Sequence, residues 1–418
     1  MRTTYERTFL LKKLKAHLQI PHPPIQVLLG PRQVGKTTLI SSFLEQWDGP
    51  TVYQTADQLS PPDVGWIVAQ WEQARRTMIS RPHGGGRRGV LVFDEIQKIP
   101  RWSEVVKKCY DEDVRTHRSL HVILLGSSSL LVQRGLTESL AGRFEVIPVP
   151  HWSFAECRAA FGLTFEDYVF YGGYPGALRL LIEAHHDTTR WGEYVRTSLV
   201  ETVLSKDILL LTPVTKPALF RQVFHLSCAH AGEVLSFNKM LGQLHEAGNA
   251  STIASYLRLL DAAMLFKPLE RFAGTRLRQK VSSPKLLVLN TALLNATLSR
   301  TFAHVRRDPT VWGRLLENVV GASLINNNLG SGMELLYFRE REMEVDFVVR
   351  YQEQVLAIEV KTDGQRHGPP EGLTHFLKRY PTARALVTAP RGGDIPIEEL
   401  ITLSIHDLVA ALPHRSHV

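Results

Sequence analysis

The fold is decided by Ile25-Gln-Val-Leu-Leu-Gly30-Pro-Arg-Gln-Val-Gly35-Lys36-Thr37-Thr38-Leu39. An apolar run ends at a glycine, and the residues that follow fit the phosphate-loop pattern G-x-x-x-x-G-K-[ST], known as Walker A. The glycines let the backbone fold tightly, so that successive N–H groups point at phosphate oxygens. A helix beginning near Lys36 adds the positive end of its dipole. The stretch therefore predicts a strand, a phosphate loop and a helix in a nucleotide-binding α/β domain.

Each residue type in this loop has an expected task. Lys36 would reach the β- and γ-phosphates as a mobile point charge, and the Thr37 hydroxyl would hold Mg²⁺. The residues that we expect to contact ATP and its Mg²⁺ are Gly30, Pro31, Arg32, Gln33, Val34, Gly35, Lys36, Thr37, Thr38 and, from the next motif, Asp94.

That next motif is Gly89-Val-Leu-Val-Phe-Asp94-Glu95, four apolar residues that end in two acids. Such a Walker B pattern predicts a buried parallel strand that delivers carboxylates at its C-terminal end, where α/β sheets bind ligands. We expect Asp94 to bind Mg²⁺, directly or through water. Glu95 would polarise the attacking water as general base.

Two further polar positions follow the later strands of this domain. The apolar run 121–125 ends in hydroxyl residues, and either Ser127 or Ser128 would sense the γ-phosphate in a sheet with a strand inserted between the two Walker strands. Arg143 precedes a predicted strand at 144–149. It fits an arginine finger, acting in cis or across a subunit interface, or an ordinary salt-bridged arginine.

Composition narrows the class of protein. A chain of 418 residues predicts two to four domains, and its formal charge of +8 is compatible with a polyanionic partner such as nucleic acid. Three distant cysteines favour neither a disulfide framework nor a zinc site. The sequence shows no secretory signal and no apolar stretch of about 18 residues, so we expect a cytoplasmic protein without a membrane span.

The middle of the chain predicts helices. Residues 151–212 are expected to form a helical lid interrupted by the glycine-rich segment 172–176. Residues 213–290 show helices near 216–230, 236–246 and 250–265, then a hairpin of 266–271 and 285–289 with a basic tip. This order is typical of a winged helix; the alternative is a plain helical bundle. The candidate DNA contacts are Ser251, Thr252, Ser255, Arg258, Arg276, Arg278 and Lys280.

The last part, 291–418, carries a second constellation. Asp346 lies in one predicted strand, and Glu359 and Lys361 share one face of the next because side chains alternate along a strand. An acid followed by Glu-x-Lys is the pattern of PD-(D/E)xK nucleases, in which the acids hold Mg²⁺ and the lysine steers water. Glu317, from a preceding helix, fits an additional acid. Whether such a site cuts DNA or only grips it stays open.

The chain as a whole resembles bacterial and archaeal AAA-like ATPases with a nuclease-like C-terminal module. The resemblance covers nearly the whole sequence and lies in residues 30–38, 90–100, 125–128, 142–143, 172–176, 206–207, 315–318 and 344–361. It implies a P-loop AAA+ core at 1–150, the helical lid, a winged-helix domain and a restriction-endonuclease-like α/β domain at 291–418. AAA+ machines usually complete their active sites between subunits, so a ring, expected to be a hexamer, is implied.

The resulting functional hypothesis is a Mg²⁺-ATP-driven motor on DNA, similar to a helicase or translocase, with branched DNA such as Holliday junctions among its candidate substrates. Two alternatives stay open. One is an ATP-regulated endonuclease; the other is a DNA-binding signalling NTPase that switches without translocating.

Overall fold

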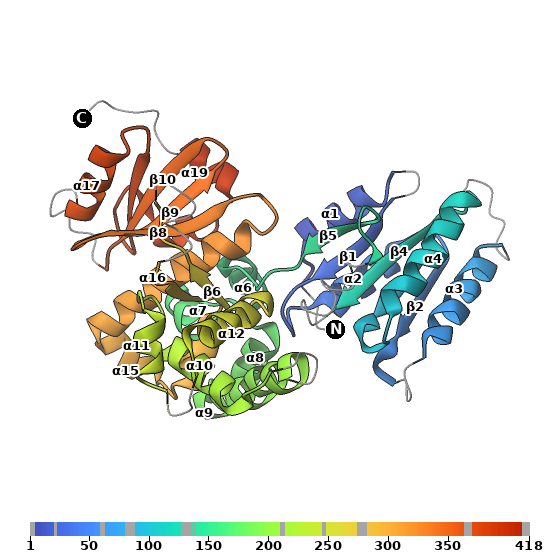
Figure 1. The fold of residues 1–418 in the computed structure, drawn as a ribbon, viewed down its shortest axis with the longest axis horizontal. Helices are drawn as coiled ribbons and strands as arrows, with labels where there is room; N and C mark the ends of the chain where they lie inside the picture. The colour runs from blue at the N-terminus through green and yellow to red at the C-terminus, as the bar shows by residue number, and fades with distance from the viewer. Residues whose placement is uncertain are drawn as a thin grey trace. The chain divides into compact units, whose positions relative to one another are not determined.

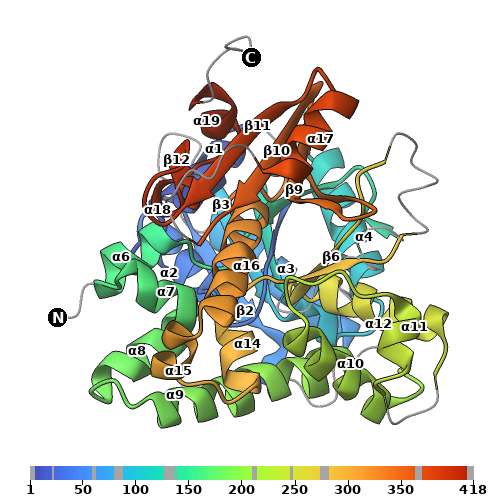
Figure 2. The same ribbon diagram turned by 90° about the vertical axis from the view of Figure 1, so that its left-hand side faces the viewer.

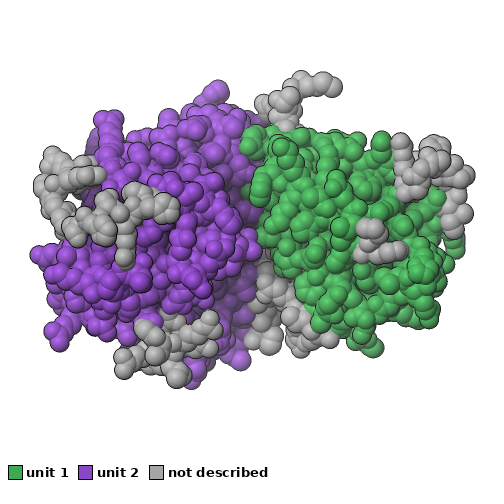
Figure 3. All heavy atoms as spheres, turned by 90° about the horizontal axis from the view of Figure 1, so that it is seen from above, with its two compact units in different colours: residues 1–149 green, residues 150–418 purple. Residues whose placement is uncertain are grey.

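β1 (Ile25–Leu29) is buried along its whole length, so both of its faces need cover. The computed structural model that provides this view describes residues 5–20, 23–58, 63–79, 88–126, 136, 139–209, 214–244, 248–273, 282–362 and 370–411. The chain divides into two units, unit 1 at residues 1–149 and unit 2 at residues 150–418 (Figure 3).

Unit 1 contains a five-stranded sheet in the order β2-β3-β4-β1-β5, and every pair of neighbours is parallel (Figure 1). Its other strands are β2 (Thr51–Thr55), β3 (Gly89–Asp94), β4 (Leu120–Gly126) and β5 (Phe144–Pro148). The phosphate-loop strand β1 and the acid-bearing strand β3 are thus separated by β4, the inserted strand that the sequence predicts. The parallel α/β core of the prediction is confirmed.

Helices cover both faces of this sheet. They are α1 (Thr8–His17), α2 (Lys36–Glu45), α3 (Val64–Ile79) and α4 (Trp102–Arg115), with short 3-10 turns η1 (Ala56–Gln58) and η2 (Ile96–Lys98). Trp71 of α3 and Val106 of α4 pack against alternate residues of β1, β3 and β4. On the opposite face, Trp47, just after α2, makes an edge contact with His121 of β4. Period-two burial on two faces explains the continuous apolar strands.

Unit 2 begins with helices, which include the predicted helical region 151–212. They are α6 (Phe154–Phe161), α7 (Phe165–Tyr171), α8 (Pro175–Glu183), α9 (Thr188–Tyr194) and the π-helical segments η3 (Val195–Val200) and η4 (Val203–Leu209). Next come α10 (Pro217–Ala229), α11 (Phe237–Leu241) and α12 (Ala250–Ala262), followed by an antiparallel hairpin of β6 (Phe266–Leu269) and β7 (Lys285–Val288).

The hairpin leads into α14 (Thr291–Thr297), α15 (Phe302–Arg307) and the long helix α16 (Pro309–Asn327). A second five-stranded sheet follows, in the order β12-β11-β10-β9-β8. Its elements are β8 (Glu334–Glu340), β9 (Met343–Tyr351), β10 (Gln354–Val360), α17 (Glu371–Arg379), β11 (Arg384–Ala389), β12 (Ile395–Pro396), α18 (Ile397–Leu400) and α19 (Ile405–Ala411).

This sheet lies between two helices. α16 contacts β7, β8 and β10, and α17 contacts β9, β10 and β11 (Figure 2). Gly321 lets α16 pack closely on the ring of Phe347, because a Cβ at Gly321 would lie 2.7 Å from that ring. On the other face, Phe376 of α17 packs with Phe338 and with Phe272, which follows β6.

The hairpin is attached to this sheet by main-chain bonds as well. Arg271 bridges Tyr337 of β8, and the Phe272 N–H donates to the Tyr337 carbonyl at 2.6 Å. The side chain of Asn318 in α16 pairs with both main-chain groups of Val288, donating to the carbonyl at 2.8 Å and accepting from the N–H at 3.0 Å. An asparagine side chain therefore closes an edge of β7 that a third strand would otherwise occupy.

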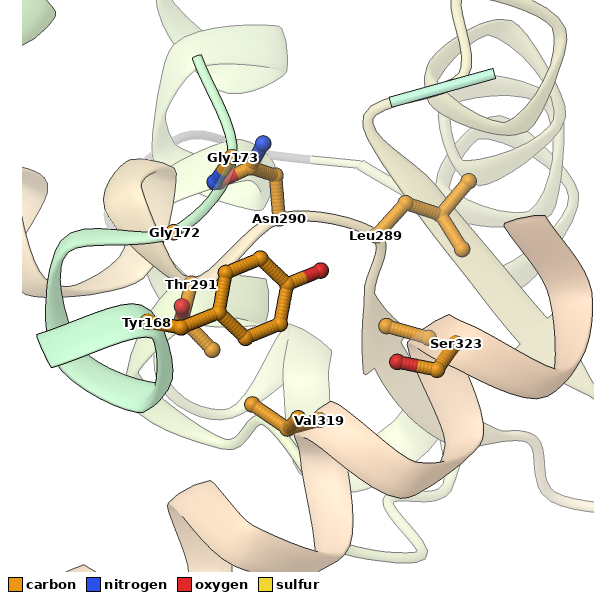
Figure 4. A pocket seen from close by; sticks show the side chains of 9 residues that line it. Tyr168, Gly172, Gly173, Leu289, Asn290, Thr291, Val319 and Ser323 are labelled. Atoms are coloured by element: carbon orange, nitrogen blue, oxygen red, sulfur yellow. The ribbon is translucent and has the colours of Figure 1, made fainter. Parts of the chain in front are cut away.

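The glycine-rich segment of the sequence has a packing reason. Gly172 has a φ of +68°, and a Cβ there would lie 2.0 Å from Asn290 Oδ1. Asn290 caps α14 and also accepts from the Gly173 N–H. A small cavity beside this turn, roughly the size of one water molecule, is lined by Tyr168 and Ser323 among others (Figure 4). The segment is therefore a junction between α7 and α14.

No helix in the described part of the chain is both long enough and apolar enough to span a membrane. The finer division of unit 2 at residues 212 and 290 stays a prediction.

Candidate functional site

The phosphate loop lies between β1 and α2. Gly30 lies against Val149, the residue after β5, because a Cβ at Gly30 would lie 2.0 Å from the Val149 carbonyl oxygen. Gly35 has a φ of +88° immediately before Lys36, the first residue of α2. Gln33 also has a positive φ, 57°. These conformations turn the chain sharply into the helix N-terminus, which is the geometry that exposes main-chain N–H groups to an anion.

Lys36 lies inside this loop. Its ammonium donates to the carbonyl oxygens of Gly30 and Pro31, both at 2.8 Å, and the residue is buried. Both acceptors belong to the loop itself. The lysine thus holds the loop closed through neutral acceptors, and phosphate oxygens are the charged partners that would replace them.

Asp94 ends β3 close to α2. Its Oδ2 lies 3.4 Å from the Thr37 hydroxyl and accepts a hydrogen bond of 2.5 Å from the Tyr53 hydroxyl. Burial raises the pKa of Tyr53, and the hydrogen bond to Asp94 raises it further. The structure brings together the two residues predicted to hold Mg²⁺. Tyr53, in β2, is a contact that sequence reasoning missed.

Glu95 follows with a φ of +54°, in the left-handed region that non-glycine residues seldom adopt. Its N–H donates to the Leu125 carbonyl of β4, and its Oε2 accepts from Gln97 Nε2 at 2.6 Å. Gln97 is buried in the turn η2. The catalytic acid of the prediction is therefore held at the end of the sheet by its own turn, and Gln97 is a second contact that sequence reasoning missed.

The remaining site residues that the sequence predicts in unit 1 are Ser127, Ser128 and Arg143. Ser127 and Ser128 lie outside the described residues. Arg143 makes a two-pronged ion pair with Asp111 of α4, with contacts of 2.6 and 3.1 Å, and this pairing raises the pKa of the guanidinium. Its carbonyl accepts from Ile25 N–H at the start of β1, so Arg143 lies at the opposite edge of the sheet from Lys36. This position favours a role across a subunit interface, or the salt bridge alone, over a role in cis.

In unit 2, α12 begins as predicted. Asn249 caps it and accepts from the Thr252 N–H and from the hydroxyls of Ser251 and Thr252, at 2.7 to 2.9 Å. The buried face of α12 is apolar, while Ser251 and Arg258 are exposed and Ser255 is half-buried. Arg276, Arg278 and Lys280 lie outside the described residues.

The four residues of the predicted nuclease constellation converge. Lys361 Nζ lies 2.7 Å from Glu359 Oε1, and Asp346 Oδ2 accepts from the Val360 N–H at 2.8 Å. Burial raises the pKa of Glu359 to about 7, and the neighbouring Asp346 adds to the shift. Burial and the charge of Asp346 likewise raise the pKa of Glu317, from α16.

At the centre of this carboxylate cluster is Lys285, the first residue of β7, which sequence reasoning treated only as the start of a strand. Its Nζ lies 2.6 Å from Glu317 Oε1, 3.4 Å from Glu344 Oε1 and 3.6 Å from Asp346 Oδ1. Only 2% of the side chain is exposed. Burial alone would lower the pKa of Lys285, but the surrounding carboxylates outweigh it and raise that pKa. The signal in the sequence is a lysine that opens an otherwise apolar strand, since a buried lysine needs a partner.

Comparison with protein families agrees with the N-terminal geometry. Residues 22–158 match a family model described as an AAA domain. Residues 162–303 and 312–408 match two models that are each described as a domain of unknown function, DUF8612 and DUF4143.

Similar proteins occur in bacteria and archaea. Uncharacterized proteins of Mycobacterium tuberculosis and Mycobacterium bovis are each 28% identical over 346 residues, which is 81% of this chain and 70% of theirs. An uncharacterized protein of Methanocaldococcus jannaschii is 22% identical over 275 residues, which is 62% of this chain and 58% of that protein. Among solved structures, a Walker-type ATPase of Pyrococcus abyssi has a TM-score of 0.51 at 14% identity, over 71% of this chain and 96% of that one.

The fold, the phosphate loop and the AAA-domain match agree. The N-terminal part of this chain is an AAA-type P-loop ATPase domain, a class that binds ATP, usually with Mg²⁺. That part of the predicted resemblance is confirmed. The nuclease-like part stays a prediction, because the matching C-terminal family is described without a function.

Proposed function

We propose that this protein is a Mg²⁺-ATP-driven AAA+ motor that acts on DNA in the manner of a helicase or translocase, with branched DNA among its substrates. The observation that carries the ATP-dependent part is the convergence of Lys36, Thr37, Asp94 and Glu95 at one edge of a parallel sheet. The basic chain and the exposed face of α12 support the DNA-dependent part.

In the proposed reaction Lys36 exchanges the two loop carbonyls for phosphate oxygens. Because those carbonyls are neutral and belong to the loop, the exchange lets the loop open around the nucleotide. Main-chain N–H groups of the loop and of the first turn of α2 then face the phosphates. Glu95, held by Gln97 and by β4, orients the attacking water and accepts its proton.

The donor set fits Mg²⁺. The Thr37 hydroxyl and the Asp94 carboxylate, 3.4 Å apart, are oxygen ligands of the kind that this ion prefers. Bound with ATP, Mg²⁺ would neutralise charge on the phosphate oxygens. Tyr53 donates to the same Asp94 oxygen, so Asp94 must share or release that hydrogen bond when the ion binds.

For DNA, α12 would be the recognition helix of a winged-helix module. Ser251, Ser255 and Arg258 recur at helical spacing on its solvent side, and Thr252 lies beside them. The hairpin tip with Arg276, Arg278 and Lys280 would supply phosphate contacts. Such contacts release counterions, so affinity should fall steeply with salt. In this proposal the C-terminal sheet is a nuclease-like module that grips DNA.

The assembly is part of the same proposal. A ring, expected to be a hexamer, would place Arg143 against the nucleotide of a neighbouring subunit, where it would stabilise charge in the transition state. In the isolated chain the Asp111 ion pair holds this arginine. Mixing Arg143→Ala with Lys36→Ala protein should then restore partial turnover through mixed interfaces.

The experiment is an ATPase assay with single-stranded, duplex, forked and four-way DNA as effectors, together with a strand-displacement assay. DNA-stimulated turnover with directional unwinding by wild type, and loss of both in Glu95→Gln, is the expected result. The matched control is Lys12→Ala, on the exposed side of α1. Turnover without unwinding on any of these DNAs would favour a signalling NTPase switch and refute the motor.

A further inference from the structure

The carboxylate cluster of unit 2 contains a cation of its own. Four carboxylates, those of Glu317, Glu344, Asp346 and Glu359, come from α16, β9 and β10, and Lys285 enters among them from β7. Two more cations lie at its margin. Lys361 contacts Glu359 at 2.7 Å, and Arg339 lies 3.9 Å from Glu344.

We infer that the Lys285 ammonium takes the place of a divalent metal ion in this cluster, so that the nuclease-like module does not cut DNA by metal-dependent hydrolysis. Carboxylates bind Mg²⁺ or Mn²⁺ at about 2.0–2.2 Å. An ion shared by Glu317 and Asp346 would lie at the point where Lys285 Nζ already approaches both. The residues present therefore do not fit the metal that the nuclease pattern implies.

The orientation of the carboxylates supports this inference. Both oxygens of Asp346 are engaged, one by Lys285 and one by the Val360 N–H. Within the described residues, no group of three or more His, Cys, Asp or Glu side chains is arranged to hold a metal ion.

Lys285 is also fixed in place. Its strand pairs with β6 on one side, and Lys285 bridges Val234 on the other. The neighbouring Leu286 exchanges main-chain hydrogen bonds with Gly232 and Glu233. Its ammonium donates to the Asp346 carbonyl at 3.3 Å and lies 5.3 Å from the centre of the Phe347 ring. Lys285 is thus held both at its backbone and at its ammonium group. It therefore cannot leave the cluster to admit an ion unless the hairpin moves.

The test measures Mn²⁺ binding to the full chain without nucleotide, by electron paramagnetic resonance of free Mn²⁺. The variants are Lys285→Met, which keeps side-chain length without charge, Lys285→Arg, which keeps the charge, and each of these with Asp346→Asn. We expect Lys285→Met to gain one Mn²⁺ site, at least about tenfold tighter than any in wild type, because a direct charge repulsion is removed. Asp346→Asn should abolish that site, and Lys285→Arg should not create it.

Wild type compared with Asp346→Asn decides the question even if Lys285→Met does not fold. Equal Mn²⁺ stoichiometry supports the inference, and loss of one site in Asp346→Asn overturns it. A folded Lys285→Met protein that gains no site also overturns it. The inference rests on the nuclease-like reading of the C-terminal module, but it is independent of the motor: its readout is metal binding, whereas the motor is tested by DNA-stimulated ATP turnover.

Discussion

Each of the two units buries a lysine, and the partners of these lysines differ. In unit 1, Lys36 donates to carbonyl oxygens of its own loop, and Asp94 accepts from the hydroxyls of Thr37 and Tyr53. In unit 2, Lys285 and Asp346 face each other directly, with Glu317 on the same ammonium. Neutral partners in the first case are exchangeable; opposite charges in the second are not.

The physical reason lies in desolvation. A buried ammonium that gives up a carbonyl for a phosphate gains a charged partner in the exchange. A buried ammonium that leaves a carboxylate strands two charges out of water, which costs several kcal/mol. A buried lysine with neutral partners therefore marks a candidate ligand site in unit 1, whereas a buried lysine with carboxylate partners forms a fixed contact in unit 2.

The largest expected effect concerns Lys36 in unit 1. Lys36→Ala should reduce ATP turnover by at least about 100-fold, because it removes the cation that is expected to reach the β- and γ-phosphates. Steady-state phosphate release measures it, and Lys12→Ala in α1 is the control. If Lys36→Ala hydrolysed ATP at the wild-type rate, the phosphate-loop assignment would be wrong.

The next effect tests the second half. Lys285→Met should destabilise unit 2 by about 3–5 kcal/mol, because Glu317 and Asp346 lose the charge that compensates them. Lys36→Met should destabilise unit 1 by less than Lys285→Met destabilises unit 2, because the hydrogen bonds of Lys36 to Gly30 and Pro31 go to neutral carbonyls. Urea unfolding followed by tryptophan fluorescence compares them. Equal losses in the two variants would show that the two lysines do not differ as described.

A smaller effect follows from Glu359. Burial raises the pKa of Glu359 to about 7 in the folded chain. The stability linked to this shift is fully present below the ordinary glutamate pKa and is lost as the pH rises from there through 7. Glu359→Gln has no such loss. Relative to wild type, the variant should gain about 1–3 kcal/mol in unfolding free energy between pH 5 and pH 8. Urea titrations at both pH values, with the exposed Glu353→Gln as control, measure this difference; a pH-independent difference would contradict it.

The smallest effect concerns Tyr53. Tyr53→Phe removes one donor from Asp94 and leaves the ring in place, so the carboxylate becomes easier to engage with a metal ion. We expect the apparent KM for Mg²⁺ in ATP turnover to fall by about two- to fivefold, the size of one hydrogen bond. An increased KM would show instead that Tyr53 orients Asp94 for the ion.

The sequence predicts local features of both units well. The loop from Gly30 to Thr38, the strand that ends in Asp94 and the Asn249 helix cap are set by residues close together in the chain. The order in which β4 separates β1 from β3 was expected by analogy with P-loop ATPases that insert a strand between the two Walker strands, and not from the apolar runs themselves. Period-two alternation also predicts that Glu359 and Lys361 share a face, whereas their meeting with Asp346 was expected from the PD-(D/E)xK pattern.

Most contacts that sequence reasoning missed join residues far apart in the sequence, whereas the Gln97–Glu95 contact is local. Tyr53 reaches Asp94 from the neighbouring strand, Arg143 reaches Asp111 in a helix, and Lys285 meets Asp346 from a separate hairpin. No local periodicity indicates which carboxylate a given lysine or tyrosine will meet. The partners are fixed only by the packing of whole elements, and for this reason the PD-(D/E)xK pattern could be recognised while the cation inside it could not.

The pairing of Asn318 with Val288 has a consequence for how unit 2 unfolds. A fragment that begins after residue 290 would leave the Asn318 side chain without Val288, and one that stops there would leave the Val288 N–H and carbonyl without Asn318. In either fragment a buried polar group would lack its hydrogen-bond partner, which lowers the free energy of unfolding. We therefore expect the helical region and the C-terminal sheet to unfold together, as one cooperative block, rather than as two independent domains.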